Sequence, residues 1–316
     1  MRTPVIVVGY NRAGVISRSL RNLVQCTHIA DHPVYVYIDG ARSNGDIADV
    51  SLVLDVVRNI KRDYLPQLTL VDRPCNYGCR ENILQAVCEV LEKHGRMCLI
   101  EDDVLVSRTF LDYMDGALDF YQGDQRIFNI NGYQPRYLRI PRRYAYDVYL
   151  DLRNHTPGWG IWRDRWERID FDLKDWKQFK SCQTNCEKVN KAGIDLMHML
   201  DLQADNPRVL NAWDVQCTYH MIKNGLYSIE PRFSLTKNIG FGMKSEHCSG
   251  FNPLLPTQKY YNFMPRFQLN VCPDDQIVSQ FRYISRDPRF AHRVLRKLHR
   301  MLLRFSPQFW EPIDLI

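Results

Sequence analysis

The 316-residue sequence lacks several features that would assign it to a special class of protein. No apolar run approaches the roughly 20 residues that span a bilayer, so we expect no transmembrane helix. The N-terminus does not have the form of a signal peptide, because the apolar segment Pro4–Val8 leads directly into glycine and polar residues. Internal repeats, low-complexity segments and Gly/Ser linkers are also absent. We therefore expect a globular, cytoplasmic protein whose chain begins folded.

The ten cysteines form no complete disulfide or zinc pattern. Two pairs, Cys75/Cys79 and Cys182/Cys186, have the close spacing of half a zinc site, but neither has a well-spaced second half nearby. Cytosolic proteins keep their thiols reduced. We expect reduced, structural cysteines, and zinc is the weaker alternative.

The net charge of +6 is concentrated near the C-terminus. The segment 282–304 holds eight basic residues and one acidic residue, a net charge of +7, so the rest of the chain is close to neutral. Its basic residues alternate with apolar ones, which predicts a basic amphipathic helix. Such a helix suits peripheral contact with the anionic inner face of a membrane, and it equally suits docking on the domain. No nucleic-acid-binding module is recognisable, so we expect no nucleic-acid partner.

The first hundred residues alternate apolar strand patterns with helix-period patterns, which predicts a parallel sheet with helical crossovers. In such sheets, ligands bind beyond the carboxyl ends of the strands. Asp39 follows the second strand, and the triplet Glu101-Asp102-Asp103 follows the fourth. The four predicted strands are Pro4–Gly9, Val34–Ile38, Leu68–Val71 and Met97–Ile100.

The pattern changes after about residue 125. We expect helices at Pro157–Arg168 and Trp213–Lys223, with a polar, helical stretch at 170–210 between them. The segment Asn238–Gly250 holds three glycines and few apolar groups, so we expect a loop there. Further strands are predicted at Ile127–Ile130, Tyr144–Leu150 and Leu226–Ile229.

The acid triplet Glu101-Asp102-Asp103 is the strongest chemical signal in the sequence. Three adjacent carboxylates after a buried strand repel one another unless a cation compensates them. Hard oxygen ligands of this kind suit Mg²⁺ or Mn²⁺ bound together with substrate phosphates. The alternative is a solvated turn whose acids stabilise the N-terminus of the following helix, predicted at Arg108–Leu118.

A resemblance extends this interpretation. The run Leu99-Ile-Glu-Asp-Asp-Val104 resembles the Asp-x-Asp region of GT-A glycosyltransferases, and its Glu-Asp-Asp form is similar to the N-acetylglucosaminyltransferase that initiates complex N-glycans. Bacterial family 2-like sugar transferases are also similar. Other motifs recur in the same order over residues 4–250: Val7-Val-Gly-Tyr-Asn-Arg12, Asp39-Gly40, Asn76-Tyr-Gly-Cys-Arg80, Gly158-Trp-Gly-Ile-Trp162, Trp213-Asp214 and Asn238-Ile-Gly-Phe-Gly242 with Ser245-Glu-His247.

The resemblance implies an α/β fold of the GT-A type, with a mixed, mainly parallel central sheet flanked by helices. The GT-A domain would cover 1–260, with a nucleotide-binding half at 1–103 and an acceptor half at 104–260, followed by a C-terminal extension at 261–316. The implied activity is metal-dependent, inverting transfer of a sugar from a nucleotide diphosphate, with a UDP-sugar favoured, to an acceptor hydroxyl. The acceptor would be a glycan or a lipid-linked molecule in glycan or polysaccharide synthesis.

The resemblance also implies roles for the acids. Asp103 would hold the Mn²⁺ or Mg²⁺ ion, Glu101 and Asp102 would contact the ribose and sugar of the donor, and Asp39 would bond the base. Arg12 would lie near the diphosphate.

Two positions depart from the family pattern. The chain has Asn11 where the most similar relatives have Asp before the arginine, and it lacks a base-contacting histidine. Arg80 or Asn82 would occupy the neighbourhood of that histidine.

Trp213-Asp214 resembles the segment that holds the catalytic base in inverting relatives, which implies that Asp214 is the base. An acceptor hydroxyl must lose its proton to such a carboxylate as the new bond forms. Capping of its own helix is the alternative role. Trp159, Trp162 and Trp166 share one face of the predicted helix, a spacing typical of a core. We expect Trp159 to face the acceptor and the other two to pack.

The Asn238–Gly250 loop is predicted to act as a lid over the diphosphate. Lys244 would neutralise phosphate, and His247 is either a metal ligand or a solvated side chain. Two other activities remain open: a sugar nucleotidyltransferase, and a non-catalytic carbohydrate or nucleotide binder.

Overall fold

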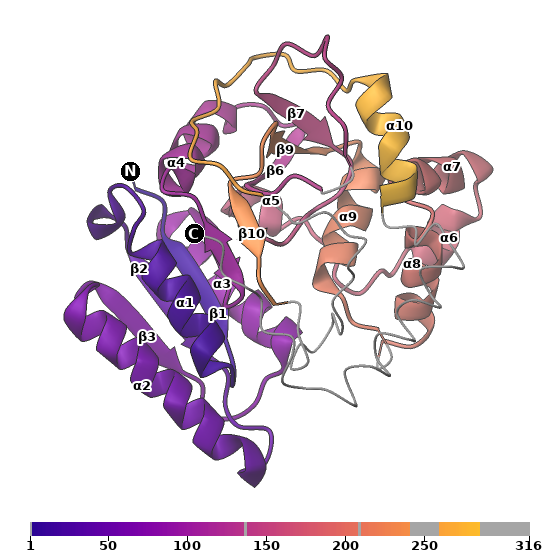
Figure 1. The fold of residues 1–316 in the computed structure, drawn as a ribbon. Helices are drawn as coiled ribbons and strands as arrows, with labels where there is room; N and C mark the ends of the chain where they lie inside the picture. The colour runs from indigo at the N-terminus through magenta and orange to yellow at the C-terminus, as the bar shows by residue number, and fades with distance from the viewer. Residues whose placement is uncertain (1, 136–137, 208–209, 241–258, 285–316) are drawn as a thin grey trace, which may run out of the picture.

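The computed structural model describes residues 2–135, 138–207, 210–240 and 259–284 of the chain. Figure 1 shows a central sheet with helices packed against it. The main strands are β1 (Val5–Gly9), β2 (Val34–Ile38), β3 (Leu68–Asp72), β4 (Arg96–Glu101), β6 (Ile127–Asn131), β7 (Val148–Asp151), β8 (Trp159–Trp162) and β9 (Tyr227–Pro231). A separate two-stranded sheet pairs β5 (Val104–Val106) with β10 (Thr236–Asn238).

The helices fall mainly between the strands in the first half of the chain and cluster together in the second half. They are α1 (Ala13–Leu23), α2 (Ile47–Asp63), α3 (Cys79–His94), α4 (Phe110–Tyr121), α5 (Arg163–Trp166), α6 (Trp176–Lys180), α7 (Gln183–Ala192), α8 (Leu196–Asp205), α9 (Trp213–Asn224) and α10 (Asp275–Ile284). Two short 3-10 helices occur at Ile29–Asp31 and Asn44–Asp46.

The large sheet has eight strands in the order β3-β2-β1-β4-β8-β6-β9-β7. Strands β3, β2, β1 and β4 are parallel neighbours, as are β6 and β9. Strand β8 runs antiparallel to both β4 and β6, and β7 runs antiparallel to β9. This topology confirms the predicted α/β fold with a mixed, mainly parallel sheet flanked by helices.

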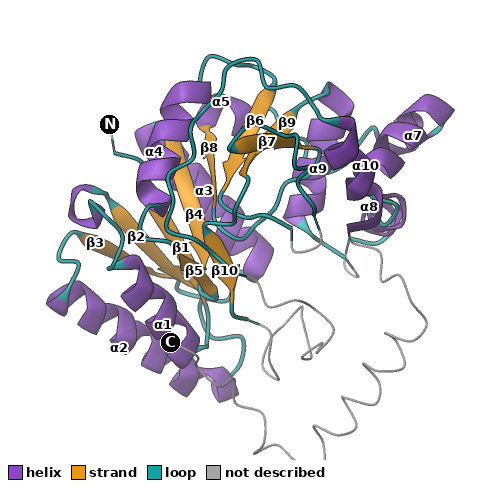
Figure 2. Cartoon of the chain, turned by 45° about the horizontal axis from the view of Figure 1, so that its top comes forward, coloured by secondary structure: helices purple, strands orange, loops and turns teal. Residues whose placement is uncertain are grey.

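The two faces of the sheet bury different helices because neighbouring side chains of a strand point to opposite sides. On β1, Val5 and Val7 belong to a core shared with α1, α2 and α4, whereas Ile6 and Val8 pack with α3, α5 and α9. Figure 2 shows the helices on both sides of the strands. Because helices cover both faces of the sheet, a ligand can reach it only at the ends of the strands.

The prediction of a helix over Pro157–Arg168 is wrong for its first half. Residues Trp159–Trp162 form β8, which is inserted between β4 and β6, and only Arg163–Trp166 are helical. Both faces of β8 are buried, so the alternation of polar and apolar residues that identifies a half-exposed strand is missing. The strand predicted at Tyr144–Leu150 is also shorter, at Val148–Asp151.

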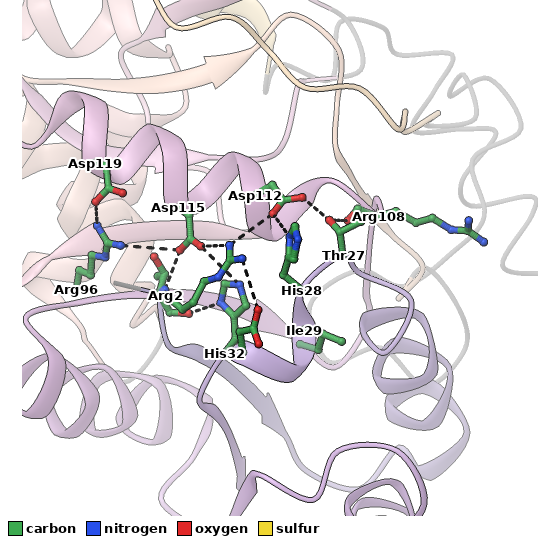
Figure 3. A network of polar contacts seen from close by, with 12 residues as sticks. Arg2, Thr27, His28, Ile29, His32, Arg96, Arg108, Asp112, Asp115 and Asp119 are labelled. Atoms are coloured by element: carbon green, nitrogen blue, oxygen red, sulfur yellow. Dashed lines mark hydrogen bonds and ion pairs between the residues drawn. The ribbon is translucent and has the colours of Figure 1, made fainter.

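A polar network fastens the N-terminus of the chain to α4 (Figure 3). The Asp115 carboxylate accepts hydrogen bonds from the backbone N–H of Thr3 at 2.8 Å and from the Arg2 guanidinium at 3.0 Å. The buried His32 lies 3.6 Å from the same carboxylate. These contacts hold β1, and with it Arg12, in place relative to the rest of the sheet.

The described part of the C-terminal extension packs back onto the domain. Phe267 lies against Gly116 of α4, so closely that a side chain at Gly116 would meet its ring at 2.8 Å. Helix α10 lies beside α7 in Figure 1, and its Phe281 is buried in a cluster with Tyr149. All but the first three residues of the predicted basic helix at 282–304 lie outside the described residues. None of the described helices is long and apolar enough to cross a membrane.

Candidate active site

The candidate site lies where β4 ends and α9 begins. Strand β8 connects the two places. Trp159 at its start pairs with Leu99 of β4, and its ring packs against Trp213 at the start of α9, with ring centroids 5.2 Å apart. Asp214 and the acid triplet therefore meet at the carboxyl edge of the sheet. This is the edge at which the strand–helix pattern predicted a ligand.

Arg12 pairs with two of the three acids. It immediately precedes α1, and its guanidinium donates to Asp102 from Nε at 3.2 Å and to Asp103 from Nη2 at 3.0 Å; a second contact joins Nη2 to Asp102. Although burial lowers the pKa of Arg12, the two carboxylates raise it above its ordinary value. Arg12 therefore remains charged, and it supplies part of the compensation that the acid triplet requires.

The alternative role of the triplet, as acids at a helix N-terminus, does not fit the structure. Strand β5 lies between the acids and α4, which begins only at Phe110. The influence of a helix dipole falls off within its first turn, so α4 does not compensate these charges.

Glu101 retains its proton at neutral pH. Burial raises the pKa of its carboxyl to about 8, and the neighbouring Asp103, Asp102 and Asp214 add to this rise, while a hydrogen bond with Thr156 opposes it. Four carboxyl groups thus lie close together here, while Arg12 pairs only with those of Asp102 and Asp103. Hard oxygen atoms with an excess of negative charge are a donor set that fits Mg²⁺ or Mn²⁺.

The strand pair β5–β10 brings a distant segment to Asp103. The Asn238 amide donates to the Asp103 carboxylate at 3.2 Å, and the Ile239 backbone N–H donates to its carbonyl at 2.7 Å. A Cβ at Gly240 would lie 2.0 Å from Asp103 Oδ2, so only glycine fits this close approach. The predicted lid thus starts at the acids, while its other named residues, Lys244 and His247, lie outside the described residues.

Asp214 lies in the first turn of α9, which starts after Ala212. The N-cap residue is Ala212, which has no capping side chain, and the Asp214 carboxylate interacts with the N–H groups of Asp214 and Val215 in the first turn. The structure is therefore compatible with the capping role as well as with the role of a base. Burial raises the pKa of the Asp214 carboxyl, and the charge of Arg153, first-turn N–H groups and His155 oppose that rise. A carboxylate with a raised pKa is a stronger general base.

Trp159 does not face an acceptor. The residue is 0% exposed, and in the core its ring stacks on Trp166 and packs at a tilt against Trp213. The prediction that Trp159 binds the acceptor is therefore wrong, because its strand position directs the ring into the core. Trp162 and Trp166 are buried as expected, but in two different clusters rather than on one helical face.

Asp39 organises the loop that follows β3. Its carboxylate accepts hydrogen bonds from the N–H groups of Gly40, Tyr77 and Gly78 and from the Asn76 amide, at 2.7–3.0 Å. Four acceptor positions is the usual capacity of a carboxylate. A base could bond Asp39 directly only by displacing one of these donors.

Arg80 and Asn82 lie on α3 in different surroundings. Asn82 is buried, and its side-chain oxygen accepts a hydrogen bond from Arg73 at 3.2 Å. Asn82 is thus held inside the domain by its contact with Arg73. Arg80 reaches toward α9, donates to Gln216 at 3.4 Å and pairs with Glu81.

The structure reveals a second polar cluster that the sequence did not indicate. Asp151 at the end of β7, His155 in the following loop and Glu230 in β9 each direct one potential ligand atom to a common point, within 4.8 Å of one another. Asp151 ends an apolar strand, much as the acid triplet follows one. This is the one feature of the sequence that could have indicated the cluster. His155 and Glu230 have no motif around them.

The cysteines agree with the expectation of reduced thiols. All nine cysteines in the described residues are free, and several are buried. Burial raises the pKa of Cys98 and Cys217, which keeps both as thiols.

Comparisons with known proteins find similarity in the backbone structure but not in the sequence. No family model matches the sequence, and no curated protein matches it. The similar solved structures include TarS 1-349 from S. aureus, with a TM-score of 0.41 and 13% identity over 73% of this chain and 60% of that one. A mannosyltransferase from Pyrobaculum calidifontis in complex with GDP-Man and Mn²⁺ has a TM-score of 0.40 and 18% identity over 71% and 74%. Apo UDP-glucose pyrophosphorylase has a TM-score of 0.36 and 10% identity over 73% and 90%.

The match to a longer form of TarS covers only part of each chain. Against a longer form of TarS, the similarity covers 51% of this chain and 28% of the other, so this chain spans little more than a quarter of that protein. Enzymes of nucleotide sugars are thus among the solved structures whose backbone is similar to this one, at low identity.

Proposed function

We propose that the protein is a metal-dependent glycosyltransferase that moves a sugar from a nucleotide diphosphate to an acceptor hydroxyl. The observation that carries the proposal is the excess of negative charge at the carboxyl edge of the sheet. Glu101, Asp102 and Asp103 converge there with Asp214, and Arg12 offsets only part of their charge. A structural role alone gives no reason to gather four acids at a strand end.

The residues would divide the work of donor binding. Asp102 and Asp103 would hold Mn²⁺ or Mg²⁺, which supplies positive charge against the diphosphate. Arg12 lies within reach of the same region and would add a second cation. The Asp39-ordered loop, with Asn76 and Tyr77 on its surface side, would receive the base of the nucleotide.

Asp214 would act as the general base. Its carboxylate would accept the proton of the acceptor hydroxyl as the oxygen bonds to the sugar carbon, and the nucleotide diphosphate would leave with the electrons of the broken C–O bond. One direct displacement inverts the configuration of that carbon. The raised pKa of Asp214 favours the proton transfer. Lys244 and His247 keep their predicted roles as partners of the phosphate or metal.

The test separates binding from transfer. Calorimetry with UDP- and GDP-sugars, with and without Mn²⁺, would measure binding to the wild-type protein and to the Asp103→Asn and Asp214→Asn variants. We expect metal-dependent binding to weaken at least about tenfold in Asp103→Asn and to persist in Asp214→Asn, which should lose transfer by about 100-fold or more. Full transfer by Asp214→Asn would show that another group is the base. Metal-independent binding, or none, would refute the donor site, and synthesis of a nucleotide sugar from a sugar phosphate would favour a nucleotidyltransferase.

A further inference from the structure

The Asp151–His155–Glu230 cluster lies on one side of β7 and β9 and includes none of the three acids of the triplet. Glu230 pairs with Tyr149 in the β7–β9 ladder, and Asp151 lies two residues further along β7, so both carboxylates point to the same side. The 152–158 loop covers that side and brings the His155 ring over them. His155 Nε2 lies 3.3 Å from Asp151 Oδ2 and 3.8 Å from Glu230 Oε1.

Neighbouring groups hold both carboxylates in fixed orientations. Glu230 accepts hydrogen bonds from the Asn131 amide at 3.0 Å and from the Tyr149 hydroxyl at 2.6 Å. Asp151 accepts one from the Arg153 backbone N–H through Oδ1 at 2.8 Å. Oriented carboxylates of this kind are typical of metal ligands, whose geometry depends on such supporting hydrogen bonds.

One carboxylate oxygen of the cluster, Asp151 Oδ2, accepts no hydrogen bond from the described residues. Asp151 is 0% exposed, yet its Oδ2 has no hydrogen-bond partner among the described residues, and it points at His155 Nε2, which likewise has none there. A buried carboxylate oxygen that accepts no hydrogen bond is costly, on the order of several kcal/mol, unless a cation lies against it.

We propose that Asp151 Oδ2, His155 Nε2 and Glu230 Oε1 bind a divalent transition-metal ion, with Zn²⁺ as the best fit. One imidazole and two carboxylates form a donor set that Zn²⁺ accepts, with a fourth position left for water. Ligand atoms about 2.0–2.1 Å from a tetrahedral ion lie roughly 3.3–3.4 Å apart. The separation of His155 Nε2 from Asp151 Oδ2, 3.3 Å, agrees with this value, and that from Glu230 Oε1, 3.8 Å, is somewhat longer. The His155 side chain is 16% exposed, which gives an ion a route from solvent.

The proposed ion would fasten the 152–158 loop to two strands. The same loop carries Thr156, which bonds Glu101 in the candidate active site. Metal binding at the cluster would therefore hold one wall of that site in place. This inference does not depend on the glycosyltransferase proposal, because the cluster uses none of the acids assigned to the nucleotide.

Zinc titration without any nucleotide tests the inference. The chelator-treated full chain would be titrated with Zn²⁺ by calorimetry, and with Co²⁺ by visible absorption, which reports the ligand geometry. We expect one high-affinity site in the wild-type protein, weakened at least about 10-fold in Asp151→Asn and His155→Gln. His198→Gln, at an exposed histidine of α8, is the matched control and should bind as the wild type does.

Folding and coordination are checked separately. His155 is partly exposed, so His155→Gln should keep the circular dichroism of the wild type even if the more buried Asp151→Asn unfolds. X-ray absorption of the Zn²⁺-loaded wild type should show one imidazole ligand, and Zn²⁺ should raise its melting temperature but not that of His155→Gln. Equal zinc affinity in His155→Gln and the wild type, or a melting temperature that saturating Zn²⁺ leaves unchanged, would overturn the proposal. Loss of the zinc site in Asp103→Asn with its retention in His155→Gln would assign the ion to the acid triplet instead.

Discussion

Replacing Glu101 by glutamine should stabilise the protein, and more so at high pH. Glu101 has a folded-state pKa of about 8, against an ordinary value of 4.5, mainly because of burial and then because of Asp103. Between these two values the unfolded chain has lost a proton that the folded protein retains. A rise in pH therefore lowers the free energy of unfolding over this range. A glutamine side chain at this position does not ionise, and it keeps the shape and acceptor oxygen that meet Thr156.

The size of the effect follows from the two pKa values. Each unit of difference corresponds to about 1.4 kcal/mol, so the ionisation of Glu101 would cost roughly 5 kcal/mol above pH 8 and about 3 kcal/mol at pH 7. Below about pH 4.5 the glutamate is protonated in both states, and the two proteins should be equally stable. The gain in Glu101→Gln should thus grow from near zero at pH 4.5 to a plateau above pH 8.

Urea unfolding at several pH values between 4.5 and 9 measures this curve. Glu92→Gln, at an exposed glutamate of α3, is the matched control, and its difference from the wild type should stay small and constant. A Glu101→Gln variant that is less stable than the wild type at pH 8, or whose difference does not change with pH, would refute the charge balance inferred for the acid triplet. The same result would remove the main support for a cation at this edge of the sheet.

Two further variants test the core and the N-terminal network. Trp159→Ala should lower the free energy of unfolding by about 3–5 kcal/mol, because it removes a fully buried ring between Trp166 and Trp213; a thermal or urea unfolding curve close to the wild type would instead support a ring exposed to an acceptor. Burial raises the pKa of Asp115, but its bonds with Thr3 and Arg2 lower it more, so its net pKa lies below the ordinary value. Stability from this carboxylate is present above the unfolded pKa near 4 and is lost as pH falls through the lower folded value. Asp115→Asn should therefore cost about 1–2 kcal/mol at pH 7 and converge with the wild type in acid, and a constant difference down to pH 3 would contradict an ionic role.

Sequence periodicity was sufficient for the first half of the fold. Strands β1 to β4 are apolar runs followed by helices with one apolar face, and each lies where the pattern predicts it. Their carboxyl ends also placed the acid triplet and Asp39 at one edge of a sheet. The prediction worked because these units are local, so that the sequence of each one contains the reason for its structure.

Tertiary packing explains the parts that the sequence did not predict. Strand β8 is buried on both faces, and its Gly160 allows the backbone of β4 to approach, with Met97 O only 2.9 Å from where a Cβ would be. Strands β5 and β10 have three residues each, too few for a visible period. The Asp151–His155–Glu230 cluster joins distant positions through strand pairing, and no local pattern marks such a site.

The register of the β5–β10 pair determines which side chain of β10 contacts Asp103. Successive residues of a strand face opposite sides, so Asn238 reaches this acid while its neighbour Lys237 points away. Inserting or deleting one residue in either strand would exchange the two side chains. An ammonium group would then form an ion pair with the acid and compete with any divalent ion for it. A shift of one position in a three-residue ladder would thereby neutralise the edge at which we propose that the cation binds.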